Sequence, residues 1–397
     1  MRRVWSGLAL AIPLLLAGCK GFWTPPSSSG GSGGTTTLSS GVFYVLNQGT
    51  NQIAAYSIAT GKLTAINAYT LPVVSPFALT VSPNSSFLYV GTASGIFLYS
   101  TGSGGALTLA NNGSSISQDA AGALRIDPTG SWLVDAWIPV TGGPVQLDSI
   151  PLASNGTANT SQKVQSISVS LAGASVKGLT ISGDGNNVFV ALGTAGTIVV
   201  PYASGAFGTT FTSIPVQHSL GADLSVAVDP VTATNSTPRL FYIGETLGNS
   251  SGSSGGLRIF NYDSLGTGSL TQVSGSPFAT GTSAPNAILA EATGGYVYVA
   301  NGNGETAAGN LSWFTIATSG TTDTVTAGNS VAAGIQPMGL AEDSQNNFVL
   351  AVSSGGSTSS GNPDLDAYTM SSGALTSVIV SATGTDPVGA SAIAAVP

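Results

Sequence analysis

His218 is the side chain of this sequence that is best suited to proton transfer. It is the only histidine, and imidazole is the one side chain whose unperturbed pKa lies near neutrality. It sits in residues 217–223 (QHSLGAD), and Glu245 follows an aromatic run farther along the chain. A histidine beside a carboxylate can act as a general base that activates water against a carbonyl carbon. His218 and Glu245 are therefore candidate catalytic residues. The alternative is that both are surface-loop residues hydrogen-bonded to the backbone.

Two cations and two further acids are candidate binding residues. Arg125 lies between Leu124 and Ile126, so its charge must either face a channel or pair with a carboxylate. Lys177 precedes another apolar run. Either cation could donate to a developing oxyanion, but a structural ion pair is the alternative for Arg125. Asp223 in the His218 segment and Glu305 in the long segment 301–310 are the acidic candidates, with a solvated rim as the alternative for Glu305.

The sequence offers little for a metal or a cofactor. With one His and one Cys, a zinc site is not expected, and we expect no cofactor. A calcium site built from carboxylates and carbonyls stays open. Gly-Asn-Gly at 302–304 precedes no helix, so it is not a phosphate loop, and no serine nucleophile elbow is present.

Charge is scarce throughout the 397 residues. Charged residues make up 7% of the chain, with 9 Lys and Arg against 17 Asp and Glu. So few cations cannot neutralise a run of phosphates, which excludes a nucleic-acid partner. Hydrophobic residues make up 42%, which is enough for a large core and argues against disorder.

The N-terminus has the pattern of an export signal. Arg2 and Arg3 precede an apolar stretch, residues 5–16, that is too short to span a membrane. The stretch ends in Leu-Ala-Gly-Cys at 16–19, which resembles the lipobox of bacterial lipoproteins; a plain secretory signal with a chance Cys is the alternative. We expect a signal peptide over 1–18, a lipid on Cys19 and a flexible tether over 19–40. Lys20 after the Cys favours, by the same resemblance, the outer membrane, on its periplasmic side or at the cell surface.

From residue 41 onward, short β-rich runs alternate with Gly, Ser, Asn and Pro turns. Seven runs are rich in aromatic and β-branched residues, and six of them follow another apolar run across a tight turn such as 127–130 (DPTG). The first run, at 43, lacks this preceding strand, and the last apolar run, at 390–396, lacks a partner. The seven aromatic-rich runs are 43–46, 87–90, 132–134, 188–191, 240–243, 296–299 and 348–351.

The last apolar run can supply the strand that the first run lacks if the two ends of the chain lie side by side. The sequence therefore predicts an all-β fold over 41–397: a seven-bladed β-propeller of four-stranded antiparallel blades, closed when the C-terminal strand joins the first blade. A β-solenoid and a pair of β-sandwiches are the alternatives. In a propeller, the loops that enter the innermost strands share one face with the loops between second and third strands, so His218 and Glu245 should meet at the mouth of the central channel.

The strands Phe-Leu-Tyr-Val-Gly (87–91) and Tyr-Val-Tyr-Val-Ala-Asn (296–301), together with residues 268–285, resemble the seven-bladed β-propeller lactonase family, which includes 6-phosphogluconolactonases. The resemblance covers about residues 41–397 and implies lactone hydrolysis. Family members carry a site Glu after an Asn at this strand end; Glu245 matches the Glu, whereas Gly244 departs from the Asn. These motifs specify blades rather than a reaction.

Two functions follow as hypotheses. The first is a lipid-anchored binding or scaffold propeller, whose Ser-, Gly- and Asn-rich loops suit a glycan, a small molecule or a protein segment at the channel mouth. The second is a lactone hydrolase that uses a water activated by His218 and Glu245, with a neutral lactone favoured because phosphate groups call for Arg or Lys clamps. We expect a monomer that is attached to the membrane only through the lipid on Cys19.

Overall fold

The computed structural model describes residues 41–59, 62–230, 239–262, 269–319, 322–355, 364–380 and 389–397. The chain divides into Met1–Thr37, outside these ranges, and Leu38–Pro397, which contains all of them. The expected signal peptide, Cys19 and the tether over 19–40 therefore lie outside the described residues. Within the described ranges, no helix has the length and apolar character needed to cross a membrane.

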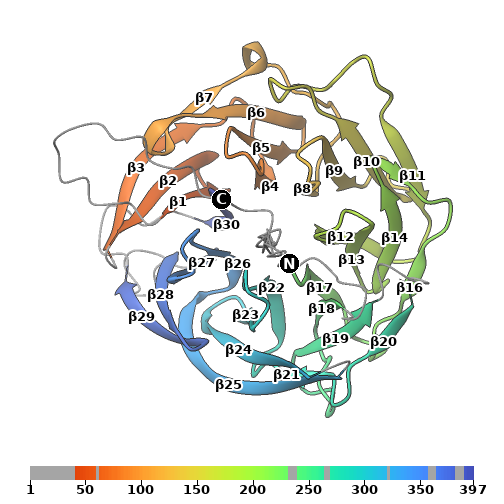
Figure 1. The fold of residues 1–397 in the computed structure, drawn as a ribbon, viewed down its shortest axis with the longest axis vertical. Helices are drawn as coiled ribbons and strands as arrows, with labels where there is room; N and C mark the ends of the chain where they lie inside the picture. Colours follow the sequence, from red (N-terminus) through yellow and green to blue (C-terminus); the bar gives the residue numbers. More distant parts are fainter. Residues whose placement is uncertain are drawn as a thin grey trace, which may run out of the picture. The chain divides into compact units, whose positions relative to one another are not determined.

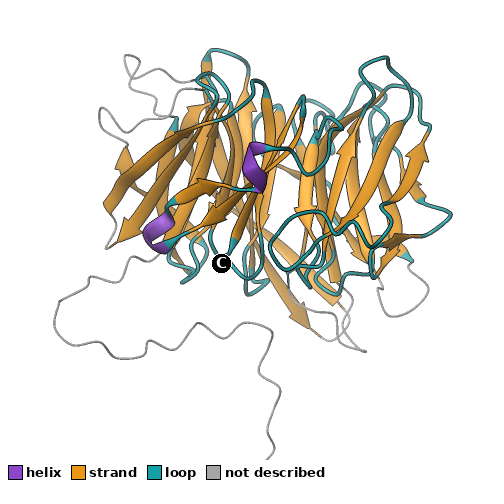
Figure 2. Cartoon of the chain, turned by 90° about the horizontal axis from the view of Figure 1, so that it is seen from above, coloured by secondary structure: helices purple, strands orange, loops and turns teal. Residues whose placement is uncertain are grey.

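The described residues form β-strands joined by turns and loops, and two short 3-10 turns are the only helical elements among them (Figure 2). The expected all-β class is confirmed. The strands in chain order are β1 (Gly41–Asn47), β2 (Gln52–Ala59), β3 (Lys62–Thr70), β4 (Pro76–Val81), β5 (Phe87–Thr92), β6 (Gly95–Thr101), β7 (Leu107–Leu109), β8 (Ala123–Ile126), β9 (Trp132–Trp137), β10 (Val145–Pro151), β11 (Gln165–Val169), β12 (Ala174–Ile181), β13 (Asn187–Gly193), β14 (Thr197–Ala203), β15 (Ala206–Phe207), β16 (Thr212–Ile214), β17 (Asp223–Val228), β18 (Arg239–Glu245), β19 (Gly256–Tyr262), β20 (Leu270–Gln272), β21 (Phe278–Ala279), β22 (Ala284–Ala290), β23 (Tyr296–Asn303), β24 (Ala307–Ser319), β25 (Thr322–Ile335), β26 (Pro337–Glu342), β27 (Phe348–Ser353), β28 (Leu365–Ser371), β29 (Ala374–Val380) and β30 (Ala390–Ala395).

Among the described residues these strands pair antiparallel into five four-stranded sheets and one ten-stranded sheet. The ten-stranded sheet consists of two groups, β12–β16 and β17–β21, joined by the single pair Gly193↔Asp223. The groups, here called blades, are β30 with β1–β3 (first), β4–β7 (second), β8–β11 (third), β12–β16 (fourth), β17–β21 (fifth), β22–β25 (sixth) and β26–β29 (seventh).

Figure 1 shows the blades arranged around a common centre, with β4, β8, β12, β17, β22, β26 and β30 innermost. The C-terminal strand β30 pairs with β1, from Phe43↔Ala395 to Asn47↔Ala390. The innermost strand of the first blade thus comes from the other end of the chain. All seven aromatic runs of the sequence lie in the second strand of a blade.

Strand β1 illustrates why these sequences form blades. Its side chains alternate between the two faces of the sheet. Phe43 and Val45 pack into one core with the seventh blade, while Tyr44 and Leu46 pack into another with the second blade. All four are fully buried. A strand buried on both faces needs a continuous apolar run rather than an alternating one, and the second strands of this chain have that composition.

The turns between first and second strands are closed by side chains. In the third blade, Asp127 accepts hydrogen bonds from the backbone N–H groups of Ser131 and Trp132 at 2.8 and 2.7 Å. In the second blade, Ser82 accepts from Ser86 and Phe87 in the same way. These short acceptors satisfy backbone donors at the start of each second strand.

Candidate functional site

The innermost strands of all seven blades line a central channel. Its cavity volume is about 180 Å³, which is room for a small molecule rather than a chain segment. Three lining side chains owe their position to irregular pairing, because the register of β4, β22 and β26 skips one residue close to where each strand begins. The skipped residues are Phe77, Asn286 and Met338, and each of them lines the channel.

Two cations also line this channel, Arg125 from β8 and Lys177 from β12, on neighbouring blades. Arg125 is exposed to the channel yet closely surrounded by protein, and this desolvation lowers its pKa. A guanidinium nevertheless remains charged in proteins. The described residues that line the channel include no carboxylate.

Within the described ranges no salt bridge joins Arg125 or Lys177 to an acid. The Arg125 guanidinium makes one long contact, 3.5 Å from Nη1 to the carbonyl oxygen of Leu124. The structural ion pair considered for Arg125 is therefore absent from the described part of the chain. Two uncompensated cations in a confined space attract an anion.

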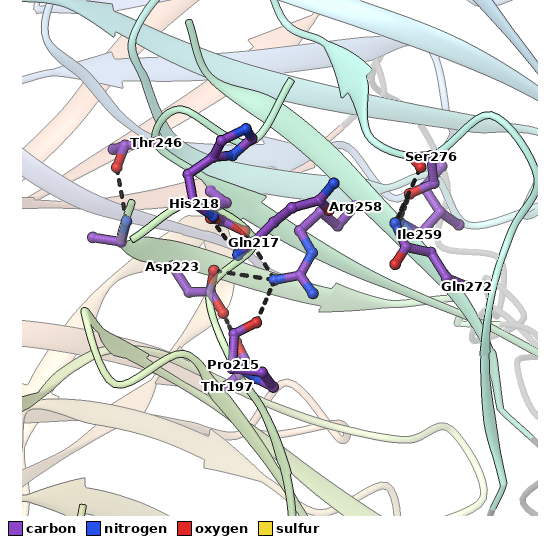
Figure 3. A network of polar contacts seen from close by, with 12 residues as sticks. Thr197, Pro215, Gln217, His218, Asp223, Thr246, Arg258, Ile259, Gln272 and Ser276 are labelled. Atoms are coloured by element: carbon purple, nitrogen blue, oxygen red, sulfur yellow. Dashed lines mark hydrogen bonds and ion pairs between the residues drawn. The ribbon is translucent and has the colours of Figure 1, made fainter. Parts of the chain in front are cut away.

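Glu245 lies at the end of β18 and is fully buried. Its Oε1 accepts hydrogen bonds from the backbone N–H groups of Gln217 and His218, at 2.7 and 3.1 Å (Figure 3). Its Oε2 lies 2.8 Å from Nη1 of Arg258. The structure thus brings His218 and Glu245 together, but through the backbone of His218 rather than through its imidazole, and neither residue is among those that line the channel.

Arg258 was not among the residues singled out in the sequence. It lies in β19, is 5% exposed and stacks over Phe260, with its Cζ 5.3 Å from the ring centroid. Its Nη1 also donates to the carbonyl oxygen of Pro215 at 3.0 Å. The signal that could have found it is the one that marked Arg125, a charge within an apolar strand.

Asp223 completes this buried network. It is fully buried at the start of β17, 3.8 Å from Arg258, and its Oδ2 accepts a hydrogen bond from the Thr197 hydroxyl at 2.6 Å. Burial raises the pKa of Asp223 to about 7, against the opposing effects of the Thr197 hydrogen bond and the Arg258 charge. Asp223 is therefore a buried bridge between the fourth and fifth blades rather than a lining residue of the channel.

The imidazole of His218 is half-buried, and its buried Nδ1 has no hydrogen-bond partner. A neighbouring loop passes directly over the ring: a Cβ added to Gly252, whose φ is +66°, would lie 3.0 Å from Nε2. Only glycine fits this position without strain. The remaining candidate, Glu305, is exposed in the turn between β23 and β24 and does not line the channel.

A second pair of acids lies in the third blade. Asp135 and Asp148 are directly opposite each other on β9 and β10. Asp135 is fully buried, and among the described residues neither of its carboxyl oxygens has a hydrogen-bond partner of normal geometry, whereas Asp148 accepts from the Trp137 indole at 2.6 Å. Burial, together with the nearby charges of Asp148 and Asp119, raises the pKa of Asp135 well above its usual range.

Metal binding has no support in the described residues, where no three His, Cys, Asp or Glu side chains converge closely enough to hold an ion. These residues define a β-propeller with a cationic, partly apolar channel and, on β17, β18 and β19, a buried Arg–carboxylate network.

Solved structures share this fold. A periplasmic gluconolactonase of Pseudomonas aeruginosa is 17% identical, with a TM-score of 0.65 over 90% of this chain and 99% of its own. A Bacteroides fragilis protein, provisionally assigned as a 6-phosphogluconolactonase, is 14% identical, with a TM-score of 0.67 over 92% and 100%. A functionally unknown protein of Desulfotomaculum acetoxidans is 14% identical, with a TM-score of 0.64 over 89% and 98%. No model of a protein family matches this chain, and no curated protein matches its sequence.

Proposed function

We propose that this propeller is a binding module whose central channel takes a small organic anion, such as a carboxylate. The observation that carries the proposal is the pair of cations, Arg125 and Lys177, that line the channel without a carboxylate partner in the described residues. Two like charges that face one narrow channel attract a counter-ion, so an anionic ligand supplies the missing partner.

The rest of the lining sets the character of the ligand. Phe77 of the second blade and Met338 of the seventh blade offer apolar surface, while Asn286 of the sixth blade offers a neutral amide. A ligand with one acidic end and one apolar or uncharged end fits these groups. The volume of about 180 Å³ limits it to a small molecule.

Isothermal titration of the mature chain with phenylacetate and gluconate tests the proposal. Arg125→Ala and Lys177→Ala should each weaken binding of the better probe by about tenfold or more, since a hydrogen bond to a charged group contributes about 1.5–3 kcal/mol. Lys163→Ala is the matched control, because Lys163 is exposed and does not line the channel. A double Arg125/Lys177 variant that binds as the wild type does would contradict the proposal.

Hydrolysis of a neutral lactone is the second candidate. It is supported by the fold shared with a protein described as a periplasmic gluconolactonase and by His218 in a loop that enters an innermost strand. Glu245 is engaged by two backbone amides and Arg258. No carboxylate of the described residues orients the His218 imidazole, whose Nδ1 has no partner there, which is why binding is preferred. The test is the rate of proton release from glucono-lactone, measured for the wild type and for His218→Ala. Rates equal to the uncatalysed background in both proteins would exclude this candidate.

The location belongs to the same proposal. We infer an exported chain attached by lipid on Cys19 to the outer membrane, with the propeller as a monomer on the periplasmic side or at the cell surface. The Leu-Ala-Gly-Cys motif at 16–19 supports it, as does the periplasmic setting of the gluconolactonase with the same fold. Labelling with a radioactive fatty acid, lost in Cys19→Ser, tests the anchor.

A further inference from the structure

The segment 215–222, here called the mouth loop, joins β16 to the innermost strand β17. Side chains of the buried network hold it. Glu245 accepts the N–H groups of Gln217 and His218, and Arg258 donates to the carbonyl of Pro215. Three backbone groups of one short loop are thus bound by two charged residues of β18 and β19 (Figure 3).

The network contains two carboxylates and one guanidinium. Arg258 lies 2.8 Å from Glu245 and 3.8 Å from Asp223, and the three side chains are between 0% and 5% exposed. The neighbouring strand β14 adds the Thr197 hydroxyl, and the mouth loop adds His218 as its one titratable side chain. From β12, the exposed Lys177 lies against Gly193, the residue paired with Asp223. With both acids ionised, a buried negative charge would be left uncompensated.

We propose that this network is a proton-operated latch: a proton on Asp223 leaves Arg258 to Glu245 and holds the mouth loop, and loss of that proton loosens it. An ionised Asp223 competes with Glu245 for the same guanidinium. As Arg258 is drawn toward Asp223, its Nη1 leaves the Pro215 carbonyl and no longer fixes the position of Glu245, so the loop that both residues hold is loosened. The latch concerns the mouth loop itself; only its effect on ligand entry rests on the proposed function.

The direction of the pH dependence follows from linkage. The folded protein raises the pKa of Asp223 to about 7, whereas an aspartate in an unfolded chain has a pKa of about 3.9. Between these values the folded state holds the proton and the unfolded state does not. The stabilising contribution is therefore complete below the unfolded pKa and is lost as the pH rises through about 7.

Hydrogen–deuterium exchange of the mature chain, measured by mass spectrometry on peptides that cover the mouth loop, tests the latch. After correction for intrinsic exchange, protection of these amides should fall by about tenfold as the pH rises from about 6 to about 8, because one pKa unit corresponds to a tenfold change. Asp223→Asn should keep its protection constant over this range. Asp119→Asn, in the segment between β7 and β8, should behave as the wild type does.

A second variant keeps the test decisive if Asp223→Asn fails to fold. Thr197→Val preserves the shape of the side chain but removes the hydrogen bond that favours the ionised form of Asp223. The loss of protection should then move to higher pH. Protection that does not depend on pH in the wild type, or an unchanged midpoint in Thr197→Val, would overturn the latch.

Titration with phenylacetate at the same pH values separates the two proposals. Absence of binding of both phenylacetate and gluconate at every pH contradicts the anion site, while the exchange data still decide the latch. If phenylacetate binds, its association rate should rise several-fold as the latch loosens. A rate that stays constant while loop protection falls would contradict the role of the latch in ligand entry.

Discussion

Asp135 is a carboxyl group in an environment that strongly disfavours its ionised form. It is fully buried, neither oxygen has a hydrogen-bond partner of normal geometry among the described residues, and Asp148 lies directly across from it. Its pKa is raised well above the ordinary range by burial and by its acidic neighbours. Because the folded state keeps a proton that the unfolded chain releases, stability should fall as the pH rises above the unfolded pKa of about 3.9.

Asp135→Asn should therefore stabilise the protein at neutral pH. The amide has nearly the same shape and needs no proton from solvent to be neutral. Each pKa unit by which the folded state favours protonated Asp135 costs about 1.4 kcal/mol at neutral pH, so we expect a gain of about 1–3 kcal/mol. Urea unfolding as a function of pH measures it. The exposed Glu305→Gln serves as the control. A wild type whose stability does not change between acidic and neutral pH, with Asp135→Asn no more stable, would refute the assignment.

At this scale the sequence found some residues of the site and missed others. His218, Glu245 and Asp223 stand out because they are rare ionisable groups, and Arg125 because it interrupts an apolar run. Arg258 also interrupts an apolar run, but its partners come from β17, from β18 and from the mouth loop. Such partners cannot be identified from spacing along the chain. Glu245 also looks catalytic in sequence because nothing there shows that its oxygens are engaged by backbone amides.

At the scale of the elements, the turn that joins β8 to β9 depends on Asp127. Its Oδ1 accepts the N–H groups of Ser131 and Trp132, and its Oδ2 accepts the Thr129 hydroxyl. Asp127→Ala should cost about 1–2 kcal/mol, as for the loss of a comparable capping side chain. Thermal unfolding followed by circular dichroism measures the change.

The chain itself supplies a matched control for this turn. In the second blade, Ser82 makes the equivalent contacts to Ser86 and Phe87. Asp127→Ser should therefore retain most of the stability that Asp127→Ala loses. If both variants melt at the same lowered temperature, the hydrogen bonds are not what stabilises the turn.

The elements also show where sequence reasoning stops. Turns such as 127–130 and the aromatic runs are readable because Pro, Gly and β-branched residues act locally. The irregular pairing at the start of β4 and β26 cannot be predicted from the sequence, since it depends on the register between each strand and the strand it pairs with. Phe77 and Met338 therefore look like ordinary core residues in the sequence, although they line the channel.

For the whole molecule, the scarcity of charge has a structural reason. Blades buried on both faces require apolar strands, and several of the few carboxylates close turns or pair within the core, as Asp127 and Glu245 do. The architecture was predictable from the unequal ends of the repeat, a missing first strand and an unpaired last one. The identity of a ligand was not, because the channel is assembled from strands of every blade.

Ring closure yields the last prediction. Strand β30 pairs with β1 and covers two cores: Ala390 and Ile393 pack with the first and seventh blades, and Ala392 and Ala394 with the first and second. Deleting residues 390–397 would expose Phe43 and Tyr44, which are now fully buried. Burying a side chain of this size contributes about 1.5–3 kcal/mol, so the truncated chain should lose its cooperative thermal transition.

A synthetic peptide of residues 389–397 should restore that transition when it is added in excess, because a bound strand stabilises the folded state by mass action. The same peptide with Ile393→Asp should not, since Ile393 packs against the core of the first and seventh blades and lines the channel. Rescue by the wild-type peptide alone would establish that the two ends of the chain form one blade. Rescue by both peptides, or a truncated chain that melts as the full-length protein does, would show that the ring does not depend on this strand.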